Sequence, residues 1–464
     1  MQRTNTFIIE DNNNFNTLFK LADNCSKLWN ELNYERRNAY INGKGINWYP
    51  KHLYNKYSVI IGSATAQQII NKNNEAWRSF LALKKMEREC RLPKHITRVS
   101  MPRYWKYKGK RELRIIVRND CYKVIDGYLY LPNGINVKYK GNIRWKGKQG
   151  RLEIFYDRVD KVWRGFMSVN VSNSNNNNNN NIDSSPRVRE SLTDKSNKTT
   201  KRLYIDLGVR CLATIWYEGL KQPIAFNGRR LLADWWYWSR RITEEQSRLA
   251  KINNVKRSRR LSKLYRIRQR RLKHAINAMA KTIVDNAYHL GIREIVIGKL
   301  KGIRSNNSNN NYNNYNNSKA NAMVNNFWSY SYIVRRIKDK AEEYGINVKE
   351  ISEYKTSSIC PYCNLEGVRR YRGLFYCKNC NIVINADVVG VLNIARKYNN
   401  NNNNNKKKTI ITIIPSPSFN TRKDRDNWVM AHPLLLRWDG MRWEPRRVMN
   451  NQPMNILEAR ISRL

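Results

Sequence analysis

The spacing of apolar residues changes from helical to strand-like near residue 98. Residues 62–88 repeat apolar side chains with a helical period, whereas short stretches such as RELRIIVRN and RLEIFYDRV follow between Gly, Asn and Asp turns over 98–171. We therefore expect a small helical unit followed by a small β-barrel or sandwich. An earlier helix over 15–42 is predicted by the helical spacing of Leu18, Leu21, Cys25, Leu28, Trp29 and Leu32.

The second half of the chain alternates strand-like and helical stretches, which is typical of an α/β domain. The segment KRLYIDLGVRCLATIWYEG, residues 201–219, predicts two strands joined by a glycine turn. A long helical stretch with an apolar stripe follows, and IREIVIGKLKG at 292–302 has the β-branched run of a buried strand. A helix over 327–345 and a strand in INVKEISEY complete this part.

Three asparagine-rich tracts interrupt the pattern, at 175–181, 305–318 and 399–405. They contain almost no apolar residues and cannot nucleate a core. We interpret them as flexible spacers that divide the chain.

The composition adds a strong positive charge. The 464 residues include 87 Lys and Arg against 36 Asp and Glu, which gives a formal net charge of +51 spread over the whole chain. Such a charge predicts a polyanionic partner, and nucleic acid is the first candidate. A membrane surface is the alternative, but no run approaches the roughly 18 apolar residues of a spanning helix. The N-terminus has no hydrophobic signal core, so we expect a cytoplasmic protein without a membrane partner.

The positive charge is densest over residues 229–273, where sixteen Lys and Arg face three acidic residues. A charge run is usually only a solvated face, yet so many like charges would repel one another without a polyanion. Basic and aromatic residues also mix over 98–171, as on surfaces that contact phosphates and stack bases; ordinary core aromatics are the alternative there. The side chains that we expect to bind nucleic acid are Arg257, Arg259, Arg260, Lys263, Arg266 and Arg270.

Four of the eight cysteines form two C-x-x-C pairs, CPYC at 360–363 and CKNC at 377–380. Two such pairs complete a tetrahedral zinc site, and a closed set of four thiolates indicates a structural metal. An iron–sulfur cluster or a redox dithiol is the alternative. The predicted zinc ligands are Cys360, Cys363, Cys377 and Cys380. The scattered Cys25, Cys90, Cys121 and Cys211 are expected to be buried thiols rather than disulfides.

Two aspartates are candidates for a second metal site. Asp206 lies in the otherwise apolar strand LYIDLGV, where burying an acid is costly unless it binds something. A turn aspartate at the Gly208 bend is the alternative. Asp387, in INADVVGVLNIARK, lies at a helix start, where N-capping is the alternative. Two acids flanking a zinc ribbon on a basic chain suggest a nuclease whose carboxylates hold two Mg²⁺ ions about 3.5–4 Å apart.

Taken in order, these motifs resemble the TnpB/OrfB family of transposon-associated proteins, which are relatives of the type V CRISPR nucleases. The resemblance implies RNA-guided DNA endonucleases with a RuvC-like, RNase H-fold site, whose aspartates correspond to Asp206 and Asp387. It also implies a guide RNA from the mobile element, a double-stranded DNA target and catalytic Mg²⁺. The segments that carry it span about 201–397: YIDLGV, the basic helical hairpin, IREIVIGKL, NNFWSYSYIVRRIKDKAEEYGI, EYKTSSICPYC, CKNC and NADVVGVLNIARK.

The resemblance further implies a division into domains, although residues 1–172 match the family only weakly. The catalytic α/β domain is expected to be interrupted by the zinc ribbon and to end with the last family motif. The expected parts are the first strand of a wedge β-barrel at 1–14, a helical recognition unit at 15–95, the wedge β-barrel at 96–172, a linker at 173–200, the RuvC-like domain at 201–356, the zinc ribbon at 357–385, the last motif at 386–398, and a linker with an unassigned extension at 399–464.

One acid of the family pattern is missing. The family's second motif reads apolar–apolar–Glu–x–Leu, and its glutamate completes the carboxylate trio, but the aligned position here is Gly298. Glu294 cannot replace it, because four residues along a strand span about 13 Å. Glu353, in ISEYKTSS, could be a relocated third ligand, and a surface glutamate near a duplex channel is the alternative.

Different functions follow for the same fold. An endonuclease would use Asp206, Asp387 and a relocated Glu353 to hold Mg²⁺ for phosphodiester hydrolysis. A nuclease-inactive RNA-guided DNA-binding protein would have lost cleavage through Gly298, and Gly298→Glu would then raise cleavage. A decayed transposon gene is a third interpretation, against which the four cysteines and two aspartates speak. In each case base pairing with the guide, rather than side chains, would read the target sequence.

Overall fold

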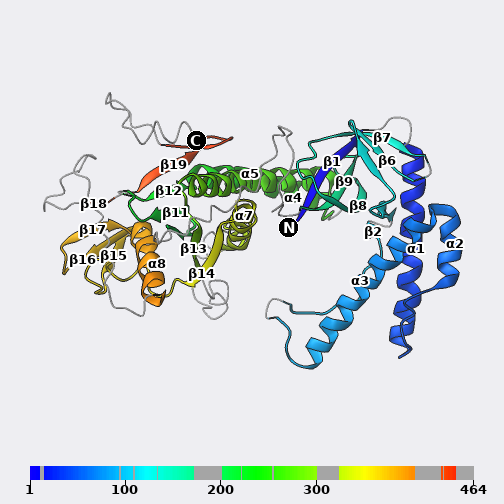
Figure 1. Ribbon diagram of the computed structural model, residues 1–464, viewed down its shortest axis with the longest axis horizontal. Helices are drawn as coiled ribbons and strands as arrows, with labels where there is room; N and C mark the ends of the chain where they lie inside the picture. Colours follow the sequence, from blue (N-terminus) through cyan, green and yellow to red (C-terminus); the bar gives the residue numbers. More distant parts are fainter. Residues whose placement is uncertain are drawn as a thin grey trace, which may run out of the picture. The chain divides into compact units, whose positions relative to one another are not determined.

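The computed structural model describes residues 1–10, 15–93, 96–107, 110–132, 134–171, 201–220, 222–252, 255–299, 323–371, 373–402, 430–431 and 433–445. The chain divides into two compact units, Met1–Ser185 and Pro186–Leu464 (Figure 1). The asparagine tracts at 175–181 and 305–318 lie outside the described residues. In the described part, no helix is long and apolar enough to cross a membrane.

The first unit combines three helices with a seven-stranded sheet. The helices are α1 (Phe15–Ile41), α2 (Lys51–Ile61) and α3 (Ser63–Arg88). The apolar spacing indicated α1 and α3, whereas α2 was not predicted. Helix α2 buries Leu53, Tyr57 and Ile61 and is separated from α3 by Gly62, whose φ of 84° suits glycine.

The sheet of the first unit has the order β4-β8-β9-β1-β7-β6-β5. Strand β1 lies inside it, antiparallel to both β9 and β7. The outer strands of the sheet, β4 and β5, do not pair with each other in the described residues, so hydrogen bonding does not close the expected barrel. Helix α1 contributes Leu18 and Ala22 to the core of this sheet. The strands are β1 (Gln2–Glu10), β4 (Arg114–Val117), β5 (Lys123–Ile125), β6 (Tyr128–Tyr130), β7 (Asn136–Lys140), β8 (Lys148–Asp157) and β9 (Val162–Asn170), and a separate pair is formed by β2 (Lys106–Tyr107) and β3 (Lys110–Arg111).

The second unit is built on a mixed sheet of order β14-β13-β10-β11-β12-β19-β20. Strand β11 is antiparallel to β10 and β12, whereas β10, β13 and β14 run parallel. The carboxyl ends of these three parallel strands therefore meet at one edge. The strands are β10 (Arg202–Asp206), β11 (Cys211–Tyr217), β12 (Ile224–Asn227), β13 (Glu294–Lys299), β14 (Asn347–Ser352), β19 (Leu434–Trp438) and β20 (Trp443–Pro445).

Helices cover both faces of this sheet. The side chains of Leu203, Ile205 and Ile297 pack into one core with α5 and α7. Tyr204 and Val296, on the opposite face, pack with α8. The helices are α4 (Arg229–Lys251), α5 (Arg259–His289), α7 (Tyr330–Glu343) with the π-helical turn η1 (Met323–Phe327) before it, and α8 (Ala386–Asn402).

Helix α8 extends to Asn402, into the third asparagine tract. The prediction that this tract is a flexible spacer from residue 399 was therefore wrong for residues 399–402. The side chain of Asn399 is buried, and its Oδ1 accepts a hydrogen bond of 2.9 Å from the Tyr204 hydroxyl. Asparagine is used here as a buried polar partner, which composition cannot reveal. The rest of the tract, from 403 on, lies outside the described residues.

Part of the C-terminal segment belongs to the sheet, so the prediction of an unassigned extension over 399–464 was wrong for residues 434–445. Strand β19 pairs in parallel with β12, and β20 pairs back on β19. Trp443 donates an indole N–H hydrogen bond of 3.0 Å to the Ala275 carbonyl of α5. Leu436, Trp438 and Trp443 are buried in the α5 core. The strand LLLRW is too short and too isolated in sequence to be recognised by pattern.

Candidate functional site

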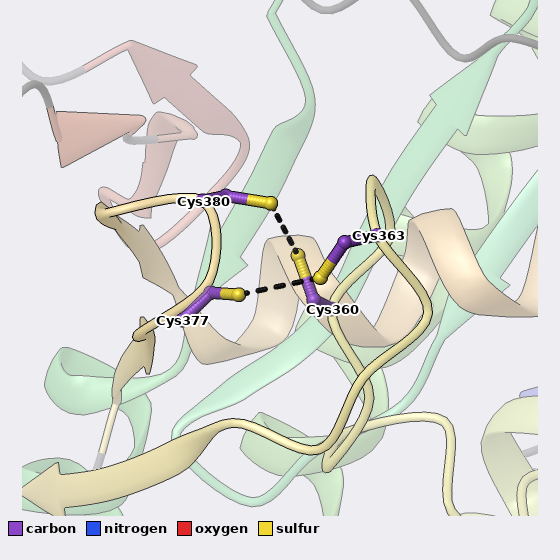
Figure 2. A group of neighbouring side chains, drawn as sticks. All are labelled: Cys360, Cys363, Cys377 and Cys380. Atoms are coloured by element: carbon purple, nitrogen blue, oxygen red, sulfur yellow. Dashed lines mark hydrogen bonds between the residues drawn. The ribbon is translucent and has the colours of Figure 1, made fainter.

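The four paired cysteines come together beside a small sheet of order β15-β16-β17-β18. Its strands are β15 (Val368–Tyr371), β16 (Leu374–Cys377), β17 (Ile382–Asn385) and β18 (Met430–Ala431). Figure 2 shows that the sulfurs of both C-x-x-C pairs point toward one another. The Sγ atoms of Cys360 and Cys380 are 3.9 Å apart, and those of Cys363 and Cys377 are 3.5 Å apart.

This cluster fits a zinc ion. All four sulfurs lie within 4.8 Å of one another, and sulfurs bound to one zinc at about 2.3 Å are about 3.8 Å apart. Burial raises the pKa of Cys360, and raises that of Cys380 to about 11. At Cys363 burial also works against ionisation, but the Leu365 backbone N–H and the neighbouring thiols lower the pKa to about 7. Thiolate is the ligand form of cysteine. The predicted set of four ligands is therefore brought together, and the cluster is consistent with a structural zinc site.

We expect about one zinc per chain in the purified protein, and loss of that zinc in a Cys360→Ser/Cys377→Ser double mutant, because each substitution removes one thiolate from a closed set. Elemental analysis measures the zinc directly. A Cys90→Ser/Cys121→Ser double mutant is the matched control and should retain it. Iron in place of zinc, or a metal-free protein that still folds, would contradict this prediction.

The remaining cysteines differ in their surroundings. Cys25 is buried, as predicted, but Cys90 is exposed, and Cys121 and Cys211 are half-buried. These four are not joined in disulfides.

Asp206 lies at the edge of the sheet where the parallel strands end. It is the last residue of β10, and the pairing of β10 with β13 places it beside Gly298. Gly298 pairs with Ile351 of β14, and Glu353 follows two residues later. Since side chains alternate along a strand, Asp206, Gly298 and Glu353 all belong to the face of the sheet that α8 covers.

Helix α8 brings Asp387 to the same place. A Cβ added at Gly390 would lie 2.4 Å from Asp206 Oδ2, so the Asp206 carboxylate rests on α8 one turn after Asp387. Asn385 Oδ1 accepts hydrogen bonds from the backbone N–H of Asp387, 2.9 Å, and of Val388, 3.4 Å. Asn385 therefore caps α8, and the alternative that Asp387 is the N-cap is wrong. The carboxylate of Asp387 remains available for another role.

The side chain of Glu353 fills the space that Gly298 leaves open. A Cβ built on Gly298 would lie 2.0 Å from Glu353 Oε1 and 2.5 Å from its Cγ, which is closer than real atoms approach. Any residue larger than glycine at 298 would displace this carboxylate. The Glu353 Oε1 atom is buried and has no hydrogen-bond partner among the described residues. A buried carboxylate oxygen without a partner is costly and indicates a missing cation or donor.

The electrostatics of the three acids indicate that they are close to one another. Burial, followed by the negative charge of Asp387, raises the pKa of Asp206 to about 7. Burial, followed by the charge of Asp206, raises the pKa of Glu353 to about 8. Burial and then the charge of Asp387 also raise the pKa of Cys211, whose thiol lies beside this carboxylate. Like charges gathered in a buried site favour a bound cation.

The residues fit Mg²⁺ in the chemistry of their donors, because Mg²⁺ prefers carboxylate oxygens. The acids are less tightly gathered than the cysteines, which are the one set in the described chain whose ligand atoms all lie within 4.8 Å. Glu294 has no part in this site: it is ion-paired with Arg202 at 3.0 Å and Lys349 at 2.8 Å, and accepts a hydrogen bond from Tyr398. This placement of Glu294 agrees with the prediction that it lies too far along the strand to replace the missing family glutamate.

The basic hairpin is formed by α4 and α5, joined by a loop whose Ser258 caps α5 by accepting a hydrogen bond from the Leu261 backbone N–H. Of the six predicted nucleic-acid side chains, Arg266 is half-buried and the other five are exposed. Arg260 lies 3.5 Å from the buried carboxylate of Glu245. Arg268 of the same hairpin was not among the predicted side chains, and its guanidinium lies over the rings of both Trp235 and Tyr265. No pattern in the sequence distinguishes it from its basic neighbours.

Sequence comparisons with known proteins agree on one family. The OrfB_IS605 family model, described as a probable transposase, matches residues 178–304, and a Cas12f1-like TNB domain model matches 330–394. A TnpB-like protein of Acidianus two-tailed virus is 32% identical over 396 residues, which cover 82% of this chain and 83% of that protein. A TnpB-like protein of Aquifex aeolicus is 34% identical over 21% of this chain and 31% of that protein. A solved Cas12f1–sgRNA–target DNA complex is similar with a TM-score of 0.49 and 14% identity, over 82% of each chain.

Proposed function

This chain belongs to the TnpB/OrfB family of probable transposases, which is related to the Cas12 effectors, and from that premise we propose that it is an RNA-guided DNA endonuclease. The observation that carries the proposal is the Glu353 carboxylate in the gap above Gly298, beside Asp206. It supports a complete trio of acids in which the third member has moved from one strand to the end of the next. The missing family glutamate is then no reason to expect a loss of activity.

The topology supports a RuvC-like, RNase H-type assignment of the second unit. An antiparallel β10–β11–β12 meander continues into the parallel β13 and β14, and the proposed catalytic acids lie at strand ends and at the start of α8. Ligands in α/β sheets bind at the carboxyl ends of strands, which is where Asp206 and Glu353 are found.

Asp206, Asp387 and Glu353 would hold Mg²⁺, which supplies a Lewis acid and lowers the pKa of bound water. The residues themselves provide clustered negative charge in a site shielded by the α8 core. Because the pKa values of Asp206 and Glu353 lie near 7 and 8, protons compete with the cation below that range. We therefore expect Mg²⁺ affinity to rise with pH over about 6–8, as these two carboxyls ionise.

The decisive test uses the full chain with its copurified RNA. We expect that sequencing this RNA identifies a guide, and that a DNA matching the guide is cut in the presence of Mg²⁺. Asp206→Asn should lower the cleavage rate at least about 100-fold, because it removes a direct ligand from the site. Filter binding should show that guided DNA affinity is unchanged. Binding without cleavage by the wild type would favour the nuclease-inactive alternative, and equal cutting by both proteins would refute the site.

The basic hairpin predicts a steep salt dependence of RNA binding. Replacing Arg257, Arg259, Arg260 and Lys263 with glutamine should flatten the slope of log affinity against log salt by roughly 0.7–0.9 for each phosphate that is no longer neutralised. The control exchanges arginine and lysine at the same four positions, which keeps the charge and should keep the slope. An unchanged slope in the glutamine variant would show that this face is only solvated.

A further inference from the structure

Asn393 of α8 joins the two candidate metal sites through a short segment of backbone. Its side chain is buried, and Nδ2 donates hydrogen bonds of 2.7 Å to both the Thr356 carbonyl and the Ile359 carbonyl. Glu353 begins this segment, and Cys360 follows directly after it. One amide thus contacts the backbone between the third carboxylate and the first zinc ligand.

The segment begins with a tight turn. Thr356 donates to the Glu353 carbonyl through its backbone N–H at 3.1 Å and through its hydroxyl at 2.9 Å. Lys355, inside the turn, has a left-handed φ of 62°, which a non-glycine residue adopts only when its surroundings enforce it. Lys397, one turn after Asn393, approaches the Tyr354 carbonyl at 3.5 Å. The turn is therefore held from the α8 side.

Glu353 needs such external support, because its own carboxylate provides little. Its Oε1 atom has no hydrogen-bond partner in the described chain, so no hydrogen bond at this atom fixes the position of the carboxylate. Its backbone N–H bonds to the Lys299 carbonyl at 3.3 Å, which anchors only the start of the turn. The end of the turn is held by Asn393, whose Nδ2 donates a hydrogen bond to the Thr356 carbonyl.

We propose that Asn393 is a positioning residue that keeps Glu353 in the gap above Gly298 by holding the carbonyls of Thr356 and Ile359. The inference rests on the proposed function, because it gives Glu353 the role of third metal ligand. It adds that α8 supplies both Asp387 and Asn393, the residue that holds the turn after β14 where Glu353 lies. The zinc ribbon, which starts at the end of the clamped segment, is thereby connected to the position of Glu353.

The test measures local metal binding rather than activity. Iron(II) with ascorbate and peroxide cuts the polypeptide near bound iron, and mass spectrometry locates the cuts in the full RNA-loaded chain. In the wild type we expect cuts near Asp206 and Glu353 that Mg²⁺ suppresses. Asn393→Ala should raise the half-saturating iron concentration at this site at least about tenfold, as removal of the groups that orient metal ligands does. Asn399→Ala removes an equally buried amide of the same helix and should leave it unchanged.

A second background separates positioning from general damage. In Gly298→Glu/Glu353→Ala the carboxylate comes from β13, so adding Asn393→Ala should no longer change iron affinity. Asn393→Ser, which keeps one donor, should show an intermediate effect and decides the matter if the alanine variant does not fold. Two results would overturn the proposal that Asn393 positions Glu353. One is an equal loss of iron affinity on Asn393→Ala in both backgrounds, and the other is no loss in the wild-type background. Absence of localised cuts in the wild type would instead overturn the proposed function, and with it this inference.

Discussion

Glu353→Gln is expected to abolish Mg²⁺-dependent DNA cleavage, with a rate loss of at least about 100-fold. The substitution keeps the size of the side chain in the Gly298 gap but removes the negative charge that a cation requires. It also removes a buried carboxylate whose pKa of about 8 reflects burial and the nearby Asp206. Cleavage of guide-matched DNA on a gel, at saturating Mg²⁺, measures the effect.

The matched control is Glu350→Gln, three residues earlier on β14. Glu350 is half-buried and ion-paired with Lys338 at 2.5 Å, away from the other acids. We expect its loss to leave cleavage within a few-fold of the wild type, since surface ion pairs contribute little. If both glutamine variants cut DNA equally, the buried Glu353 carboxylate is not a metal ligand for cleavage.

Gly298→Ala is expected to reduce cleavage nearly as much as Glu353→Gln, although it adds one methyl group to a strand. The new Cβ would overlap the Glu353 carboxylate at 2.0 Å, and the flexible end of Glu353 has to move away. No carboxylate is supplied in exchange, so the site is left with two acids. The cleavage rate should therefore fall, whereas the affinity for guide-matched DNA should stay unchanged.

Three further variants test the same geometry. Gly45→Ala, where an added Cβ meets nothing within 4 Å, should be silent. Gly298→Glu combined with Glu353→Ala moves the acid to the position that the family motif leads one to expect, and should recover cleavage relative to Gly298→Ala. Gly298→Glu alone crowds two acids into one place and should not improve on the wild type. A clear gain by the single variant would show that Glu353 does not occupy the site.

The sequence was sufficient for what depends on local spacing. Both C-x-x-C pairs were recognised as one cluster because each pair grips a metal within four residues of chain. Asp206 was singled out as a candidate because it is polar in an otherwise apolar strand. The helices α1, α3 and α5 follow from a strong apolar period.

What the sequence could not supply depends on register between strands that are distant in the chain. That Glu353 reaches Gly298 follows from the pairing of β13 with β14, more than fifty residues apart, and no periodicity encodes that alignment. The same holds for β19, whose partner β12 lies some two hundred residues earlier. Asn393 and Asn399 look like members of polar or low-complexity stretches until their hydrogen-bond partners are known.

The long separation of β19 from β12 along the chain has a consequence for synthesis on the ribosome. Strand β12 emerges early but can pair with β19 only once residues 434–438 have been made. Until then β12 presents an unpaired strand edge, and Phe226 lacks the ring of Trp443 that packs against it at 5.3 Å. The sheet that carries Asp206 is therefore completed only some two hundred residues after β12 has been made. During that interval we expect the nascent protein to depend on chaperones more than its size alone would require.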